Sequence, residues 1–295
     1  MDLKGIITAM VTPMDKQQKI NYPATKQLVD YLIGSSVDGI FILGTNGEFH
    51  LLSNKEKLEF AEKVIEEVDG RVPVFVGTGG NGTEEVIKLS KEMEKIGADA
   101  LSIITPYFIT PSQSEVIRHY NKIAESVSLP ILLYNIPGRT GMTLEPETVV
   151  ELAKMDNIIG IKDSSGSFEN IKKYIEITKD EKFSVLAGTD SLILKTLMAG
   201  GKGAIAATSN MIPDIVVAIY QNWLKGNMEE AQKAQEDLQP LRDTFKYGTL
   251  PSVLKKAVEL YSNIPVGPPR FPAVEPTGKA LEKVEEMVEF YKKQV

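Results

Sequence analysis

One lysine stands at the end of an apolar run, where charged residues are uncommon. Lys162 follows residues 158–161 (IIGI), a run typical of a strand that is buried on both faces. Burial disfavours the ammonium form of a lysine and so favours the neutral amine, which is a nucleophile. Such an amine can attack a carbonyl carbon and form an imine, or Schiff base. The alternative is a lysine that reaches solvent or pairs with a carboxylate, and position alone leaves both open.

Two further candidates belong to the apolar run at 131–134, which precedes 158–161 in the chain, and to the loop that follows it. Tyr134 ends the run 131–134 (ILLY), and Arg139 lies in the loop that follows. A phenol within hydrogen-bond reach can transfer protons beside an imine, and a guanidinium group suits a substrate carboxylate. The alternatives are a core tyrosine with a satisfied hydroxyl and an arginine in a surface ion pair.

Two glycine-rich segments could approach an anion. Thr45 and Asn46 lie within residues 44–47 (GTNG), where backbone N–H groups could point at a carboxylate, although a tight turn explains the glycines equally well. Residues 77–82 (GTGGNG) match the G-x-G-x-x-G pattern of dinucleotide-binding folds. That fold also needs an acidic residue at the end of the next strand. The run 100–104 is followed by Thr-Pro instead, so we expect no nucleotide site.

The residue types that are scarce exclude several other chemistries. The 295-residue sequence has no cysteine and two histidines, His50 and His119. Disulfides, thiolate nucleophiles and cysteine-based metal sites are therefore excluded. The sequence has no G-x-S-x-G motif to supply the serine of a Ser-His-Asp hydrolase. A zinc-dependent aldolase would need several imidazoles, so catalysis must depend on Lys, Tyr, Thr, Arg and carboxylates.

Charge and hydropathy argue against a nucleic-acid or membrane protein. Lys plus Arg number 33 and Asp plus Glu 40, which gives a net charge of −7 with no basic arm. Binding to phosphates or to an anionic membrane needs a concentrated positive face. The N-terminal residues have no signal-peptide pattern, and no apolar run approaches the roughly 18 residues of a membrane span. We expect a soluble protein in a cytoplasmic setting.

The elements that must position these residues form a repeating pattern. Near-continuous apolar runs alternate with amphipathic windows such as 54–68 and 83–96, of which the first begins with a capping box at Ser53 and Glu56. The expected strands are eight: 7–11, 39–43, 73–77, 100–104, 131–134, 158–162, 183–187 and 203–206. Eight strand–helix units predict an α/β fold, a (β/α)8 TIM barrel. A doubly wound sheet is the alternative, because strand order cannot be read from a sequence.

The rest of the chain predicts a helical extension. Helices are expected near 210–224, 228–245, 250–260 and 276–294, with a proline-rich connection at 265–275. We therefore divide the chain into a barrel with the catalytic site, residues 1–224, and a C-terminal helical extension packed on it, residues 225–295. A TIM barrel has its active site at the carboxyl ends of its strands, where the candidates named above would meet.

Taken together, these motifs resemble one family. The motifs are VTPMD at 11–15, GTNGE at 44–48, YNIPGRTG at 134–141, GIKDSSG at 160–166, GTD at 188–190 and GGKGAIA at 200–206. They resemble the dihydrodipicolinate synthase / N-acetylneuraminate lyase family of class I, pyruvate-dependent aldolases. The resemblance covers the whole chain, and the motifs fall at predicted strand ends.

The resemblance implies a role for each candidate. Lys162 matches the lysine that forms an imine with the keto carbon of pyruvate or another 2-keto acid, and Tyr134 matches the tyrosine that moves protons. Thr45 matches a residue that both holds the pyruvyl carboxylate, with Asn46, and joins Tyr134 in a hydroxyl relay. The protonated imine acts as an electron sink, so the resemblance implies no metal and no other cofactor.

Three further positions are carried over in the same way. Arg139 matches the arginine that binds the carboxylate of the second substrate in synthases, and the backbone of Ile205 matches a position that lines the pyruvyl pocket. Tyr107 matches a residue close to the tight dimer contact. The family usually forms homotetramers built from dimers, so the resemblance implies a homotetramer or homodimer.

The choice of reaction depends on two departures from the synthase pattern. Phe108 takes the place of a tyrosine that typical synthases contribute to the relay across the dimer contact, and Asn46 takes the place of a second threonine. We therefore expect cleavage or formation of a 2-keto-3-deoxy acid, similar to 2-keto-3-deoxygluconate. Arg139 favours the alternative, a dihydrodipicolinate synthase that condenses pyruvate with aspartate semialdehyde. A non-catalytic ligand-binding paralogue is a remote alternative, because Lys162 and Tyr134 are both retained.

Overall fold

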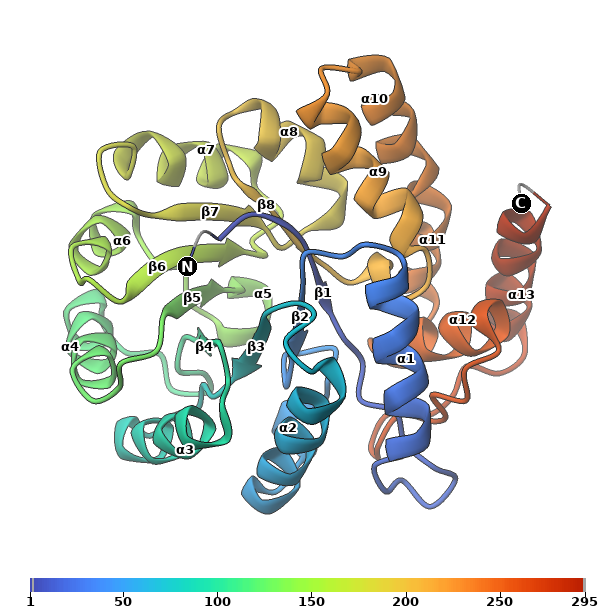
Figure 1. The fold of residues 1–295 in the computed structure, drawn as a ribbon, viewed down its shortest axis with the longest axis horizontal. Helices are drawn as coiled ribbons and strands as arrows, with labels where there is room; N and C mark the ends of the chain where they lie inside the picture. Colours follow the sequence, from blue (N-terminus) through green and yellow to red (C-terminus); the bar gives the residue numbers. More distant parts are fainter. Residues whose placement is uncertain (2, 294–295) are drawn as a thin grey trace.

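Eight parallel strands close into a barrel in the computed structural model, which describes residues 1 and 3–293 (Figure 1). The strands are β1 Gly5–Ala9, β2 Gly39–Ile42, β3 Val74–Gly77, β4 Ala100–Ile104, β5 Ile131–Asn135, β6 Ile158–Asp163, β7 Ser184–Ala187 and β8 Gly203–Ala206. They pair in chain order, and β8 pairs with β1. The barrel prediction is confirmed. The doubly wound alternative is wrong, because such a sheet keeps two open edges.

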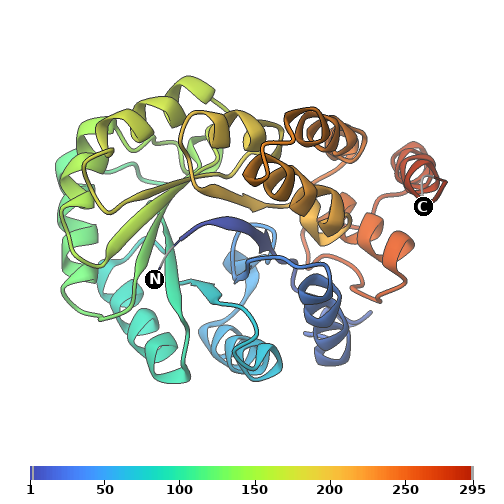
Figure 2. The ribbon, with the colours of Figure 1, turned by 45° about the horizontal axis from the view of Figure 1, so that its top comes forward.

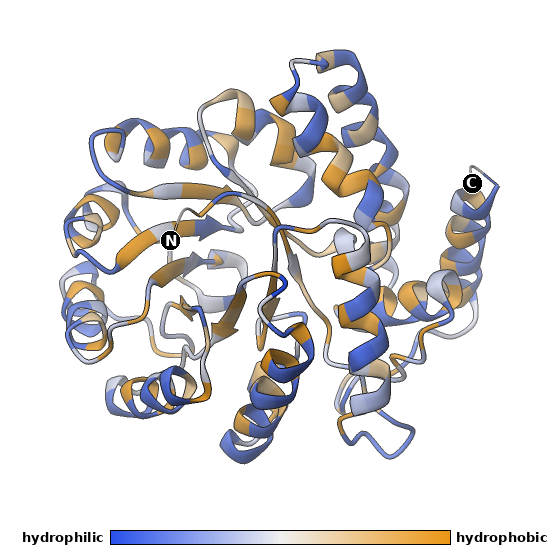
Figure 3. Ribbon diagram, in the orientation of Figure 1, coloured by the Kyte–Doolittle hydropathy of each residue, from blue (hydrophilic) through white to orange (hydrophobic). Residues whose placement is uncertain are grey.

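Helices surround the barrel and cover the outer face of the sheet. They are α1 Tyr22–Gly34, α2 Asn54–Val68, α3 Thr83–Ile96, α4 Gln113–Ala124, α6 Pro146–Ala153, α7 Phe168–Ile177, α8 Ile193–Met198 and α9 Pro213–Leu224. The helices predicted at 54–68 and 83–96 are confirmed, and both hydrogen bonds of the Ser53–Glu56 capping box form. Hydrophobic residues predominate along the strands and alternate with hydrophilic residues along the helices (Figure 3), as expected for amphipathic helices on a buried sheet.

The strand periodicity decides which residues point into the barrel. The interior cluster includes Phe41 of β2, Leu132 of β5 and Ile205 of β8, whereas a larger cluster lies between strands and helices. Alternate residues of a strand face the same side of a sheet. Tyr134 therefore faces the interior as Leu132 does, at the carboxyl end of β5.

One segment expected as a loop forms a short helix. Residues after β5 form α5 Pro137–Thr140, with a proline in its first turn. Proline suits this position because its φ angle is preset and its missing N–H would be unpaired there anyway. Arg139 therefore projects from a helical turn rather than from an extended loop.

The C-terminal helices are α10 Met228–Asp237, α11 Gln239–Thr244, α12 Ser252–Ser262 and α13 Lys279–Lys292. The prediction of one helix at 228–245 is wrong, because Pro240 interrupts it and occupies the first turn of α11. The helix predicted at 276–294 is α13, and residue 294 lies outside the described residues. Figures 1 and 2 show α13 beside α12, at the side of the barrel. Within the described part of the chain, no helix is long and apolar enough to span a bilayer.

Candidate active site

Lys162 and Tyr134 face each other across two neighbouring strands. They are partners in the register between β5 and β6. The Nζ atom of Lys162 lies 4.1 Å from the centroid of the Tyr134 ring and 5.0 Å from that of the Phe41 ring. Only 4% of Lys162 is exposed. Two aromatic faces therefore replace most of the water around this amine, and they attract a cation only moderately.

The surroundings of Lys162 differ from those of the other buried lysine, Lys255. Lys255 forms an ion pair with Glu48 at 3.0 Å, whereas no ion pair joins Lys162 to a carboxylate of the described residues. Asp163, the next residue, accepts hydrogen bonds from the Ser165 backbone N–H and the Asn170 amide instead. Burial raises the pKa of Asp163. Lys162 is thus a buried amine with no ion-pair partner among the described residues, in the kind of apolar pocket where lysine nucleophiles are found.

Tyr134 connects this amine to the loop after β2. Its hydroxyl lies 3.2 Å from the Thr45 hydroxyl, and either oxygen can donate the hydrogen bond. The Tyr134 ring also meets the edge of the Phe41 ring, with centroids 6.3 Å apart. Two hydroxyls in sequence can pass a proton, because each both donates and accepts. The structure therefore brings Lys162, Tyr134 and Thr45 together.

A cavity of about 290 Å³ lies beside this group. Its lining comes from four separate connections of the chain: Thr45, Phe49, His50, Ile104, Tyr107, Arg139, Thr140, Thr249 and Leu250. Thr45 is at once a lining residue and the hydrogen-bond partner of Tyr134. The volume suits a small ligand held by a few polar groups in a largely apolar wall.

Arg139 supplies a positive charge to this cavity. It lies on α5 with an exposed side chain, and it makes no ion pair with a carboxylate in the part of the chain that is described. The interpretation of Arg139 as a member of a surface salt bridge is therefore not supported. A guanidinium group with free donors can bind an incoming carboxylate through two hydrogen bonds.

The remaining predicted residues take different places. Tyr107 lines the cavity and meets the edge of Phe49 at 6.3 Å, and burial raises the pKa of Tyr107. Asn46, next to Thr45, is partly buried but does not line the cavity. The side chain of Ile205 is buried in the barrel interior with Phe41.

Six lining residues were not predicted as site residues: Phe49, His50, Ile104, Thr140, Thr249 and Leu250. His50 follows the GTNGE motif, and burial lowers its pKa, with Arg139 acting in the same direction. Thr249 and Leu250 come from the connection before α12 and reach the same cavity as Arg139. No local pattern marks these two residues, because their place depends on how the C-terminal extension packs.

The G-x-G-x-x-G segment has a packing explanation. A Cβ atom on Gly77 would lie 2.0 Å from the Leu43 carbonyl oxygen, and one on Gly79 would lie 2.6 Å from the Ile104 backbone nitrogen. These glycines allow the loops after β2, β3 and β4 to approach closely. The pattern therefore needs no nucleotide to account for it.

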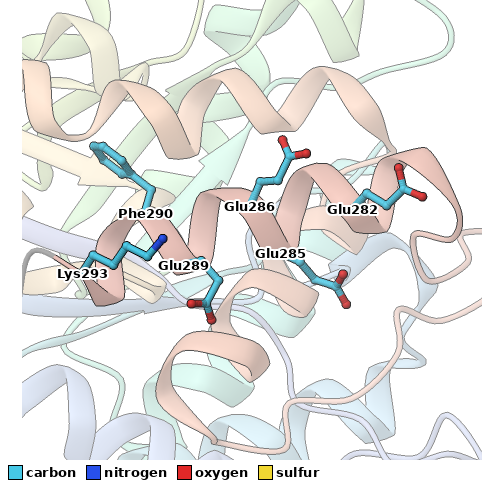
Figure 4. Close-up of a pocket in the computed structure, with 6 residues that line it drawn as sticks. All are labelled: Glu282, Glu285, Glu286, Glu289, Phe290 and Lys293. Carbon is cyan, nitrogen blue, oxygen red and sulfur yellow. The ribbon is translucent and has the colours of Figure 1, made fainter.

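A hollow larger than this cavity lies elsewhere, along α13 (Figure 4). It measures about 760 Å³ and is lined by one helix alone: Glu282, Glu285, Glu286, Glu289, Phe290 and Lys293. The side chains fan out from the helix instead of converging on one point (Figure 4). Size alone therefore does not mark a site here.

The barrel fold and the buried lysine at the end of β6 are those of a class I aldolase, a lyase that works through a Schiff base. Comparison with protein families supports this class. The model of the dihydrodipicolinate synthetase family matches residues 2–290, and the chain belongs to this family. The resemblance found in the motifs is confirmed.

Individual relatives are similar over nearly their whole length. The chain is 41% identical to 4-hydroxy-tetrahydrodipicolinate synthase 1 of Halalkalibacterium halodurans, covering 97% of this chain and 96% of the relative. It is 38% identical to 4-hydroxy-tetrahydrodipicolinate synthase of Oceanobacillus iheyensis, covering 98% and 97%. Among solved structures, it matches YagE, a prophage protein of this family from E. coli K12 in complex with pyruvate. That match has a TM-score of 0.94 and 34% identity, and covers 98% of each chain.

Proposed function

We propose that this protein is a 4-hydroxy-tetrahydrodipicolinate synthase, which condenses pyruvate with aspartate semialdehyde. The observation that carries the chemistry is the buried amine of Lys162, held between the Tyr134 and Phe41 rings without a carboxylate partner. The choice of substrates is supported by the relatives of that name, at 38% and 41% identity.

Lys162 begins the reaction as the nucleophile. Its amine attacks the keto carbon of pyruvate, a C–N bond forms, and the keto oxygen leaves as water. The resulting imine is protonated and withdraws electrons, so the methyl carbon of pyruvate loses a proton. That carbon then forms the new C–C bond with the aldehyde carbon of the second substrate, whose oxygen takes up a proton. The amino group of the second substrate then attacks the imine carbon, closes the ring and displaces the Lys162 amine, which leaves as the free amine.

Tyr134 and Thr45 carry the protons of these steps. The Tyr134 ring lies against the Lys162 amine, and the 3.2 Å contact between the Tyr134 and Thr45 hydroxyls extends the path toward the cavity. A group must be within hydrogen-bond reach to act as a general acid or base. Phe108 has no hydroxyl to continue the relay, so water takes the third place.

The carboxylates of the two substrates have separate binding groups. Thr45 and Asn46 hold the pyruvyl carboxylate with the N–H groups of their loop, and the backbone of Ile205 lines the pyruvyl pocket. Arg139 binds the carboxylate of aspartate semialdehyde in the cavity that it lines together with Thr45 and Tyr107.

The competing function is retro-aldol cleavage of a 2-keto-3-deoxy acid such as 2-keto-3-deoxygluconate. The phenyl ring of Phe108 and the amide of Asn46 favour this cleavage, and they are the reason why the sequence predicted it. The similarity to synthases over 97–98% of the chain favours the condensation instead. We give the similarity more weight, because water can replace one hydroxyl of a relay.

One preparation of the protein decides between the two reactions. kcat/KM is measured for pyruvate with aspartate semialdehyde, and for pyruvate release from 2-keto-3-deoxygluconate and related acids. We expect the condensation to have the larger value by at least about ten-fold, or about 1.4 kcal/mol in transition-state stabilisation. A larger value for a sugar acid would contradict the proposed synthase and support the competing function.

Several expectations stay predictions from the resemblance and the composition. These are a homotetramer or homodimer, a cytoplasmic location, and catalysis without a metal or other cofactor. The division into a barrel of residues 1–224 and an extension of residues 225–295 also stays a prediction, and residues 294–295 lie outside the described part of the chain.

A further inference from the structure

A buried ion pair lies beneath the loop that carries Thr45 and Asn46. The Nζ atom of Lys255, on α12, is 3.0 Å from Oε1 of Glu48, and the two side chains are 0% and 1% exposed. Burial lowers the pKa of Lys255, and the charge of Glu48 acts in the opposite direction. Removing two charges from water is costly, so a pair of this kind is weak evidence for a stabilising role.

The hydrogen bonds of the pair are complete. The Lys255 ammonium also donates to the carbonyl oxygens of Thr12, at 2.9 Å, and Pro268, at 2.7 Å, which uses its three donors. The second oxygen of Glu48 accepts a 2.7 Å hydrogen bond from the Arg270 backbone N–H. The pair therefore ties the loop after β2 to the loop after β1, to α12 and to the connection that follows α12.

The loop itself has a strained backbone. Leu43 and Glu48 both have φ angles of +57°, on either side of residues 44–47. This left-handed conformation is unfavourable for side chains such as these, and it persists only where the surroundings hold it. The Thr12 hydroxyl supplies a second restraint, a 2.7 Å hydrogen bond to the Gly47 carbonyl oxygen.

We propose that Lys255 and Glu48 are positioning residues that hold Thr45 and Asn46 in the geometry needed to bind pyruvate. Neither residue lines the cavity. They act through the loop, whose position sets the 3.2 Å distance between the Thr45 and Tyr134 hydroxyls. This inference rests on the proposed function of Thr45, and it makes α12 part of the machinery that recognises the substrate.

The test variant is Lys255→Met, which keeps an unbranched side chain of similar length and removes its charge. The protein is equilibrated with a series of pyruvate concentrations and treated with borohydride, and intact mass gives the fraction of reduced pyruvyl adduct. We expect the pyruvate concentration for half-maximal adduct to rise at least about ten-fold, since small displacements of binding groups have large effects. The KM for pyruvate should rise in parallel.

Lys256→Met is the matched control. Lys256 is the next residue of α12 and pairs with Glu275 at 2.8 Å, outside the loop after β2. For this variant, the pyruvate concentration that gives half-maximal adduct should equal that of the wild type. If Lys255→Met does not fold, the double variant Glu48→Gln/Lys255→Met replaces it, because no charge is then left buried alone. We expect the same rise in the pyruvate concentration for half-maximal adduct in the double variant.

The outcomes separate two kinds of failure. An unchanged half-maximal concentration in a folded variant, with only a lower unfolding temperature, would mean that the pair is structural and would overturn the inference alone. Absence of any adduct in the wild type would instead overturn the proposed function, and the inference with it.

Discussion

Tyr134 and Lys162 are register partners on β5 and β6, and the Lys162 amine lies 4.1 Å from the centre of the Tyr134 ring. The strand geometry alone enforces this contact, because inward-facing residues of neighbouring parallel strands stand side by side. The ring covers the amine, and its hydroxyl reaches Thr45 at 3.2 Å. One side chain thus both shields the amine from water and contacts the Thr45 hydroxyl.

Lys162 should be the only lysine modified when the protein is treated with pyruvate and borohydride. The reason is its burial between two aromatic rings without a counter-charge. Peptide mapping after reduction gives the site of the adduct, and Lys162→Ala should lack both adduct and turnover. A chelator should leave the wild-type rate unchanged. Modification of a different lysine, or activity that is lost with EDTA and restored by a metal ion, would contradict the Schiff-base mechanism.

Tyr134→Phe should retain the fold and lose activity. The phenyl ring keeps the contacts with Lys162 and Phe41, and only the hydroxyl that meets Thr45 is removed. We expect kcat to fall roughly 10²-fold or more, the scale of a lost proton-transfer group. Steady-state kinetics and a thermal melt check the two statements. A variant with nearly normal kcat would mean that Tyr134 serves packing alone.

The strands and their inward-facing ends were predictable because each rule involved is local. Apolar runs locate buried strands, and the rule for TIM barrels places their ends together. The cavity wall was predictable only in part. Thr249 and Leu250 reach it from the C-terminal extension, and Lys255 pairs with a residue 207 positions away. Such contacts depend on tertiary packing, and no residue spacing in the sequence predicts them.

Arg139→Ala should affect the second substrate and spare the first. The side chain lies on the exposed α5 turn at the cavity, so its removal should cost little stability. A hydrogen bond to a charged group contributes about 1.5–3 kcal/mol, so KM for aspartate semialdehyde should rise by roughly 10- to 100-fold. Pyruvate trapping on Lys162 should not change. Arg118→Ala, an exposed arginine of α4, is the control. Equal effects of the two variants would contradict a binding role for Arg139.

His119 should make the folded state less stable as the pH falls from about 6.5 to about 4. Burial lowers the pKa of His119 to about 4, and its Nδ1 lies 2.9 Å from the Thr83 hydroxyl. Below pH 6.5 the unfolded chain binds a proton that the folded chain does not, so the free energy of unfolding decreases. His119→Phe keeps a ring against Tyr120 and removes the titration. Urea unfolding at pH 7 and pH 5 should show a smaller difference for the variant. An equal difference would contradict this assignment.

Phe108→Tyr should raise the rate of condensation. The side chain of Phe108 is 92% exposed and follows Tyr107, which lines the cavity, so an added hydroxyl disturbs no packing within this chain. The resemblance implies that a second copy of the chain brings this position to the relay of Thr45 and Tyr134. A tyrosine there would replace the proposed water by a fixed group. We expect kcat to rise by about ten-fold. This is less than the roughly 10²–10⁴-fold effect of a direct proton-transfer group, because the proposed water already transfers the proton at this place in the relay. Phe108→Leu, which also lacks a hydroxyl, should have the wild-type rate in the same assay. Equal rates for the tyrosine and leucine variants would mean that the relay does not pass through this position.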